Sequence, residues 1–185
     1  MMGRIARFMA LSFPFALLAG CGTTEAGAGG AIIGDSGAPV SAAAIFEVKP
    51  GSSTAGTVKF IQTEDGVLIA AVLSGLPPGK HGIHLHEKGD CSEPDFASAG
   101  AHFNPTNQPH ACPPEGARHA GDLGNIDVDA DGTGRFKLTT DLLTLDDGPS
   151  SVVGKAVILH DMVDDCTTQP SGGSGVRLSC AVVVK

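Results

Sequence analysis

Residues 55–74 have the sequence AGTVKFIQTEDGVLIAAVLS, in which two apolar runs, 55–62 and 67–74, flank a short polar break. Glu64, Asp65 and Gly66 lie in that break. An acidic residue followed by glycine between two such runs is typical of the turn of a β-hairpin. The stretch therefore predicts two antiparallel strands joined by a tight turn.

Runs of the same kind lie on both sides of this hairpin. The 26 glycines and 12 prolines, with only 4% aromatic residues, favour many tight turns and short strands. Two segments without a sustained period, 87–123 and 161–176, are expected to form long functional loops. The chain is thus predicted to be all-β, with about eight strands at the spacing of a barrel or sandwich. Besides the two strands of the hairpin, the predicted strands are 40–48, 82–86, 124–129, 134–140, 152–160 and 177–184.

Length and charge limit the function classes. The 185 residues, 42% apolar and 17% charged, suit one globular domain with tails. Twelve Lys and Arg residues stand against 20 Asp and Glu, a net charge of −8, and Tyr and Trp are absent. Nucleic-acid binding normally needs a basic face and stacking side chains, so no nucleic-acid partner is expected.

The N-terminus predicts export. Arg4 and Arg7 precede an apolar run, 8–20, that is too short to span a membrane. The run ends in LAGC at 18–21, which resembles a bacterial lipobox. We expect residues 1–20 to be a lipoprotein signal peptide, Cys21 to be acylated, 21–39 to be a flexible tether, and 40–185 to be the domain. The protein would then face the periplasm or the cell exterior from a membrane; an ordinary signal peptide with a chance cysteine is the alternative.

The cysteines predict disulfides. If Cys21 carries lipid, four of the five cysteines remain, and an exported chain with four cysteines favours two disulfides. Three pairings are possible, and spacing alone does not choose among them. No CxxC spacing occurs, which argues against a thiol-redox enzyme or an all-cysteine zinc site.

The histidines predict a metal centre. His84 and His86 are two residues apart on a predicted strand, so both project from one face. Three more histidines fall in the first long loop, and another ends a strand. Neutral imidazole is the commonest metal ligand and suits copper and zinc. The candidate ligands are His84, His86, His102, His110, His119, His160 and Asp122.

Five short motifs carry a resemblance to a known family. They are GIHLHE at 82–87, AHFNP at 101–105, HAGDLGN at 119–125, HDMVDD at 160–165 and RLSC at 177–180. In order and spacing they resemble copper/zinc superoxide dismutase, over roughly residues 40–184. The short spacing between His86 and Cys91 resembles the bacterial members. The resemblance implies an eight-stranded Greek-key β-barrel with both metals on its outside, under two long loops.

The resemblance also implies the ligands. Copper would be held by His84, His86, His102 and His160, and zinc by His102, His110, His119 and Asp122. His102 would bridge the two metals, and Asp164 would join a copper histidine to a zinc histidine. His81 matches a structural position of the family and is left out of the metal set.

The implied activity is dismutation of superoxide to dioxygen and hydrogen peroxide by a copper redox cycle. Arg177 would receive the anion beside copper, and His102 would donate a proton to the product. Cys91 and Cys180 would form the disulfide of the family. Cys112 and Cys166 then remain, and we expect them to form a second one, with two buried free thiols as the alternative.

Two other functions are compatible with these residues. One is a copper-binding or copper-buffering lipoprotein on the same barrel, without turnover. The other is a zinc-only structural or adhesin-like domain, which the four copper-type histidines argue against. The resemblance leaves the oligomeric state open between monomer and homodimer.

Overall fold

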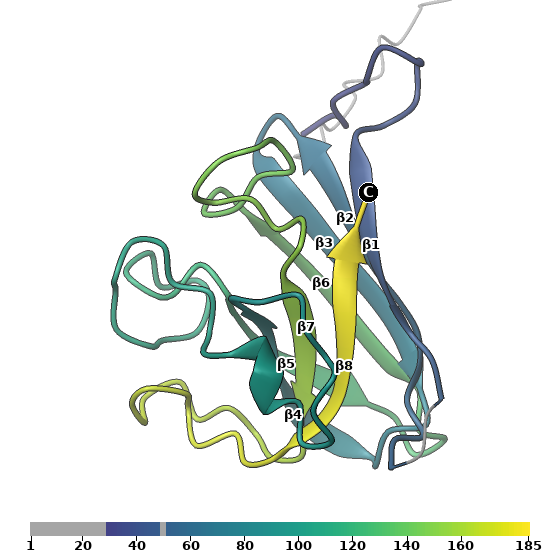
Figure 1. Ribbon diagram of the computed structural model, residues 1–185, viewed down its shortest axis with the longest axis vertical. Helices are drawn as coiled ribbons and strands as arrows, with labels where there is room; N and C mark the ends of the chain where they lie inside the picture. The colour runs from purple at the N-terminus through teal and green to yellow at the C-terminus, as the bar shows by residue number, and fades with distance from the viewer. Residues whose placement is uncertain (1–28, 49–50) are drawn as a thin grey trace, which may run out of the picture.

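The computed structural model describes residues 29–48 and 51–185. Eight antiparallel strands close into a barrel in the order β1-β2-β3-β6-β5-β4-β7-β8 (Figure 1). This confirms the predicted all-β barrel with eight strands. The strands are β1 (Ser41–Phe46), β2 (Ala55–Thr63), β3 (Gly66–Ser74), β4 (Gly79–His86), β5 (Asp122–Val128), β6 (Gly134–Thr140), β7 (Ala156–His160) and β8 (Arg177–Val184), with one 3-10 turn, η1 (Ala97–Ala99).

The β2–β3 hairpin forms as its sequence predicts. The two strands pair from Ala55 opposite Ser74 to Thr63 opposite Gly66. Gly66 has φ 117°, and a Cβ there would lie 2.3 Å from the carbonyl oxygen of Thr140. Only glycine fits this turn without displacing the neighbouring strand.

The interior of the barrel is filled by alternate apolar residues of the strands. In β2 and β3 the inward apolar side chains are buried, and the residues between them are partly or fully exposed. These inward side chains are Val58, Phe60, Val67, Ile69, Ala71 and Leu73. Burial of these side chains supplies the main stabilisation of the fold. The largest fully buried apolar side chains are Phe60, Ile69, Leu73, Ile83, Leu85, Ile126, Leu145, Ile158 and Leu159.

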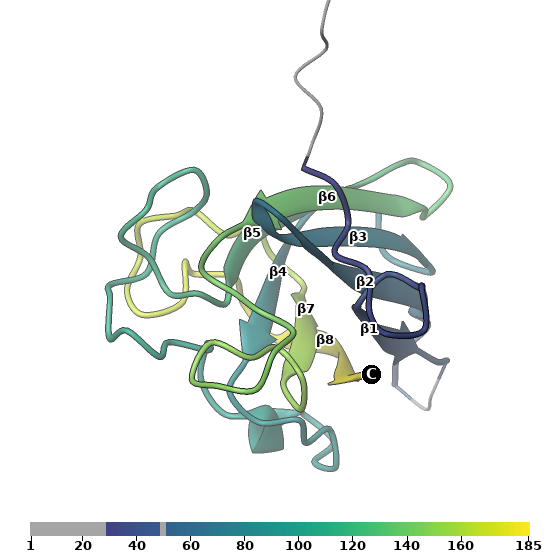
Figure 2. The same ribbon diagram turned by 90° about the horizontal axis from the view of Figure 1, so that it is seen from above.

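Strand β4 is covered on both faces. It begins at Gly79, three residues before the predicted start, because Gly79 pairs with Val128 of β5. Ile83 and Leu85 point into the barrel, and the intervening His84 and His86 are also buried. Two long segments, 87–121 and 161–176, extend from the β4–β7 side of the barrel (Figures 1 and 2).

Strand β7 is shorter than the predicted run 152–160. It begins at Ala156, because Gly154 has φ 76° and the chain turns there. Val152 donates its N–H to Thr144 instead of continuing the strand.

The described part of the predicted tether is hydrogen-bonded to the barrel. Ile32 donates to the carbonyl of Gln62, and Val40 donates to the carbonyl of Ile32. Residues 30–40 therefore lie against the end of β2, so that a flexible tether would be shorter than 21–39. The predicted signal peptide and Cys21 lie outside the described residues. Within the described ranges no helix has the length and apolarity needed to cross a membrane.

Candidate metal centre

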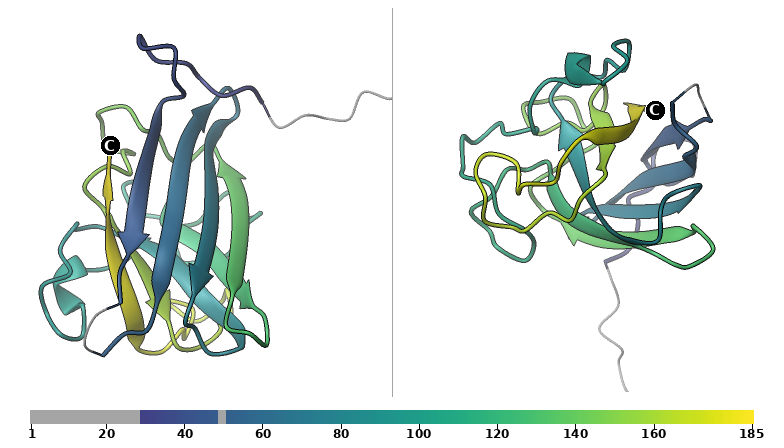
Figure 3. Two further views of the ribbon diagram at one scale, coloured as in Figure 1. Left: turned by 90° about the vertical axis from the view of Figure 1, so that its right-hand side faces the viewer. Right: turned by 90° about the horizontal axis from the view of Figure 1, so that it is seen from below.

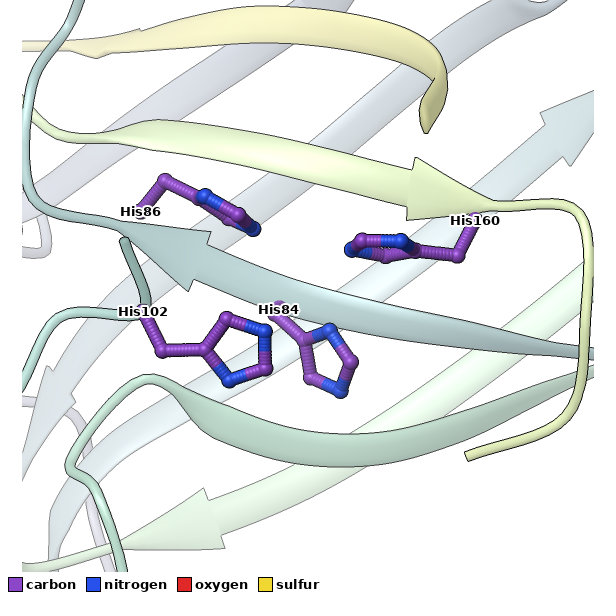
Figure 4. A group of neighbouring side chains, drawn as sticks. All are labelled: His84, His86, His102 and His160. Atoms are coloured by element: carbon purple, nitrogen blue, oxygen red, sulfur yellow. The ribbon is translucent and has the colours of Figure 1, made fainter. Parts of the chain in front are cut away.

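Four histidines converge on the outer side of β4. His84 and His86 project from β4, His160 ends the neighbouring strand β7, and His102 forms a β-bridge with His86 (Figure 4). All four are buried, and each offers a ring nitrogen within 4.8 Å of the others. Three separate segments of the chain thus build one nitrogen-lined site.

The nitrogens that face this site fit a metal ion. His84 Nδ1, His86 Nε2, His102 Nε2 and His160 Nε2 are buried and have no hydrogen-bond partner among the described residues. Such groups are rare in native proteins because burial without a partner is unfavourable. Metal coordination would satisfy all four together, and an all-nitrogen set is one that copper accepts.

Hydrogen bonds fix the opposite nitrogens of these rings. His86 Nδ1 donates to the carbonyl of Gly100 at 2.9 Å, and His84 Nε2 donates to Asp164 Oδ2 at 2.8 Å. His160 Nδ1 has a longer contact, 3.4 Å, with the carbonyl of Gly175. Each bond places the ring proton away from the centre and leaves the inner nitrogen a lone pair for coordination.

Burial also keeps these rings neutral. It lowers the pKa of His86 from 6.5 to about 2 and that of His160 to about 3. Burial lowers the pKa of His84 to about 4, although the hydrogen bond to Asp164 opposes this shift. The three imidazoles are therefore uncharged at neutral pH, which is the state that binds a metal.

A second group of ligands surrounds Asp122, which is fully buried. His102 Nδ1 lies 2.7 Å from its Oδ1, His119 Nδ1 3.1 Å from the same oxygen, and His110 Nδ1 3.0 Å from Oδ2. The His110 nitrogen is close to the carboxylate but not aligned for a hydrogen bond. Tetrahedral zinc with bonds of about 2.0 Å sets its ligand atoms about 3.3 Å apart. The three-histidine, one-carboxylate set therefore fits zinc.

The protonation of His110 differs from that of the copper-type histidines. Burial lowers its pKa, but the adjacent Asp122 carboxylate and the hydrogen-bonded Asp164 carboxylate outweigh burial and raise it to about 9. Burial would raise the pKa of both carboxyl groups, but the neighbouring histidine rings hold both pKa values well below the usual range. Without a metal, His110 carries the proton that offsets two buried carboxylates, and zinc would replace that proton.

His102 belongs to both groups. Its Nδ1 lies beside Asp122, and its Nε2 is the partnerless nitrogen of the four-histidine site. The ring centroids of His84 and His102 are 4.1 Å apart. The structure thus places the predicted bridging residue between the two ligand sets.

Asp164 connects the two sets from outside. Its Oδ2 accepts from His84 Nε2 at 2.8 Å and its Oδ1 accepts from His110 Nε2 at 2.9 Å. Asn125 of β5 holds its backbone in place, donating to the carbonyl of Asp164 at 2.9 Å and accepting from its N–H at 2.8 Å. Asn125 lies in the HAGDLGN motif, but no sequence signal indicated this role.

Two further contacts join the long loops to each other. A disulfide links Cys112 to Cys166, with 4.9 Å between the Cα atoms. The side-chain amide of Gln169 donates to the carbonyl of His110 and accepts from its N–H, both at 2.8 Å. The loops are therefore fastened together without a metal. No sequence signal singled out Gln169.

A cavity of about 530 Å³ opens above the four-histidine site. Arg177 lines it, and its guanidinium donates to the carbonyls of Phe96 and Gly100. The described residues that line the cavity include no other cation and one acid, Glu87. Cys91 and Cys180 form a disulfide behind Arg177, and Phe96 packs against it. The guanidinium is thereby held in a fixed position at the wall of the cavity.

Arg118 and His81 have supporting roles. Arg118 is buried and donates to the carbonyls of Asp122 and Glu115, which fixes the loop that carries His119. The sequence analysis did not identify it, because a lone arginine carries no such signal. The two ring nitrogens of His81 contact the carbonyls of His160 and Pro77 at 3.0 and 2.8 Å, so His81 lies outside both ligand sets.

Comparisons with known proteins agree with this geometry. A solved structure described as a crystal structure analysis of the clock protein EA4 is 37% identical to this chain, with a TM-score of 0.72. The match covers 79% of this chain and 94% of that one. The sequence model of copper/zinc superoxide dismutase matches residues 54–183. The chain therefore belongs to the copper/zinc superoxide dismutase family, whose members bind copper and zinc.

Proposed function

We propose that this protein catalyses the conversion of two superoxide ions and two protons to dioxygen and hydrogen peroxide. The observation that carries this proposal is the pair of buried ligand sets that share His102 and open onto a cavity with one fixed cation. Bound copper would supply one-electron redox chemistry, and bound zinc a fixed positive charge. The residues of the chain would bind and orient the substrate and protonate the product.

Arg177 binds and orients the substrate. It donates to two backbone carbonyls, and its remaining N–H groups are available to an anion in the cavity. Burial lowers its pKa, but an arginine stays charged at neutral pH. A small anion entering the cavity therefore meets a guanidinium whose position is already set.

His102 can pass a proton to the product when its Nε2 is not coordinating the metal. Its Nδ1 is oriented by Asp122, and its Nε2 faces the four-histidine site and has no protein partner. A departing peroxide needs two protons, one of which Nε2 of His102 can donate while the other comes from solvent. Asp164 keeps His84 and His110 in register on either side of this ring.

Metal binding without turnover is the second candidate. The structural neighbour is described as a clock protein and not as an enzyme. The discriminating experiment loads the purified chain with both metals and follows superoxide consumption with and without a copper chelator. Consumption that the chelator abolishes is expected. Stable binding of both metals with no consumption would favour the binding protein.

Export and anchoring are further parts of the proposal. The sequence of residues 1–21 supports cleavage before Cys21, acylation of its thiol, and a location at the periplasmic or external side of a membrane. The mass of the N-terminal peptide of the native protein tests this. Light scattering of the purified protein would distinguish a monomer from a homodimer.

A further inference from the structure

The sheet β1-β2-β3-β6 faces the viewer in Figure 3 (left). Its strand positions carry three basic residues on the outer face, Lys59, Arg135 and Lys137, and no acidic one. Lys185 directly follows β8 and lines the same face beside Lys59. We call this surface, with its four exposed cations, the cationic face. The whole chain has 20 acidic and 12 basic residues, so such a face departs from the average charge.

Strand register places these charges close together among apolar side chains. Lys59 lies opposite Ala70, and Ala70 lies opposite Lys137 on the next strand. With strands about 4.8 Å apart, the two lysine Cα atoms are about 10 Å from each other. Val72, 55% exposed, lies opposite Arg135 in the neighbouring row.

A shallow hollow of about 510 Å³ lies at the β1 side of the cationic face. Its lining includes Ala43, Ile45, Ile61 and Val184, with Lys59 and Lys185 among them. Ile45 is 61% exposed and Val184 is 54% exposed. The face thus combines exposed apolar surface with cations at its borders.

Among the described residues, the cations of this face form no ion pair, since no carboxylate there lies within 4.0 Å of any of the four. Asp127 of β5, opposite Arg135, bounds the face on one side, and it pairs with Lys80 at 2.6 Å. The other neighbouring acids lie one residue beyond the ends of the strands: Glu47, Glu64, Asp65 and Asp141. The four charges are therefore available to an external anionic surface.

We propose that the cationic face docks on an anionic phospholipid surface, that of the membrane holding Cys21. The proposal rests on the proposed acylation of Cys21. Gly29 lies eight positions after Cys21, a reach of at most about 28 Å. Residues 30–40 are hydrogen-bonded to the end of β2, the strand of Lys59. A lipid at Cys21 would keep this sheet near the headgroups, where each cation adds attraction and the apolar side chains meet the interface.

The geometry agrees with this orientation and disfavours a second copy as the occupant. Strands β4 and β7, which carry the copper-type histidines, lie across the barrel from β2 and β3 (Figure 2). The metal cavity would therefore stay open to solution when the cationic face is docked. A two-fold dimer through this face would set its four cations against the same four.

The test places the full lipidated chain in vesicles of phosphatidylcholine alone, or of phosphatidylcholine and phosphatidylglycerol in equal parts. The acylation rate of each lysine by a soluble amine-reactive ester is followed by mass spectrometry. Lys59, Lys137 and Lys185 should react several-fold more slowly on the anionic vesicles. The rates of Lys80, Lys88 and Lys155 should be the same on both. High salt should remove the difference.

Matched variants sharpen the result. K59Q with K137Q should abolish the protection of Lys185, whereas K80Q with K88Q, which removes the same charge, should leave it intact. Equal rates for all lysines on both vesicles would overturn the proposal. Slow reaction of Lys59, Lys137 and Lys185 in the absence of vesicles, lost on dilution of the protein, would show that the face contacts a second copy of the chain. That result would also overturn the proposal.

A failure of the proposed lipidation of Cys21 can be recognised separately. In that case the N-terminal peptide has no added lipid mass, and the chain does not float with phosphatidylcholine vesicles. Flotation with the anionic vesicles alone, lost in K59Q with K137Q, would then still support the cationic face. Absence of flotation with both vesicles would overturn it.

Discussion

His86 and Arg177 donate hydrogen bonds to the same acceptor, the carbonyl oxygen of Gly100, at 2.9 and 2.7 Å. One ring of the four-histidine site and the cation that lines its cavity therefore share one backbone acceptor, and Arg177 has a second acceptor in the carbonyl of Phe96. A shift of Gly100 would disturb both groups. The four-histidine site and Arg177 are thus structurally coupled.

The first prediction concerns Arg177. Replacing it by alanine removes the fixed cation of the cavity but no ligand of either metal. We expect the superoxide rate to fall by about tenfold, equivalent to about 1.4 kcal/mol, and inhibition by small anions to weaken. Stopped-flow superoxide decay and metal analysis check this. An unaltered rate with both metals bound would show that Arg177 has only a structural role.

The second prediction is a shallow dependence of the rate on salt. The net charge of the chain is −8, and the loop 161–176 contains Asp161, Asp164 and Asp165 but no lysine or arginine. Screening limits attraction to charges within about 8 Å of the path at physiological salt. Arg177 alone lines the cavity as a cation among the described residues. A steep fall of the rate with added salt would contradict this.

The third prediction concerns the disulfide between Cys112 and Cys166. It joins the segments that carry His110 and Asp164. Replacing both cysteines by serine should speed the loss of zinc to a chromogenic chelator by about tenfold or more, because the closed loop no longer limits opening. The turnover of the fully metallated protein should change less.

Gln169→Ala provides a matched control for that experiment. It removes the two hydrogen bonds to His110 and leaves the disulfide in place. We expect a smaller increase in the zinc-loss rate than in the double serine variant. Equal zinc-loss rates in the wild type and the serine variant would exclude the disulfide as a determinant of zinc retention.

The fourth prediction concerns acid stability of the metal-free protein. The pKa values of His84, His86 and His160 are lowered on folding from 6.5 to about 4, 2 and 3. Below pH 6.5 these three rings are protonated in the unfolded chain but stay neutral in the folded protein. The free energy of unfolding therefore falls as the pH drops from 6.5 toward 4. Each ring contributes about 1.4 kcal/mol per pH unit in this range, so the loss for the three together is roughly 8 kcal/mol by pH 4.

His110 acts in the opposite direction at higher pH. Its folded pKa is raised to about 9, so its contribution is complete below pH 6.5 and is lost as the pH rises through 9. The metal-free protein should therefore be most stable near neutral pH. Urea titrations across this range check both limits, and a stability that increases toward pH 4 would be inconsistent with the buried neutral histidines.

Much of the fold and the ligand residues could be predicted because their signals are local. The alternation in 55–74 and the turn at Gly66 define the hairpin, and the motif at 82–87 places two histidines on one face of a strand. The ligand sets needed the family resemblance, since His102 and His160 are brought together by tertiary contacts that no periodicity reveals.

The supporting residues were beyond sequence reasoning for the same reason. Asn125 and Gln169 act through backbone atoms of Asp164 and His110, 39 and 59 residues away. Their side chains have no special pattern in the sequence. The composition of 21–39 predicted a flexible tether, but within its described part backbone groups at Ile32 and Val40 form hydrogen bonds that composition does not encode.

The central claim is that the paired ligand sets sharing His102 support superoxide turnover. The most direct test adds a known excess of superoxide to the copper- and zinc-loaded protein and measures dioxygen and hydrogen peroxide together. We predict one dioxygen and one peroxide for every two superoxide ions, formed over many turnovers per protein and much faster than in the same solution with the metal-free protein. Formation of both products no faster than with the metal-free protein, or peroxide without dioxygen, would contradict the account.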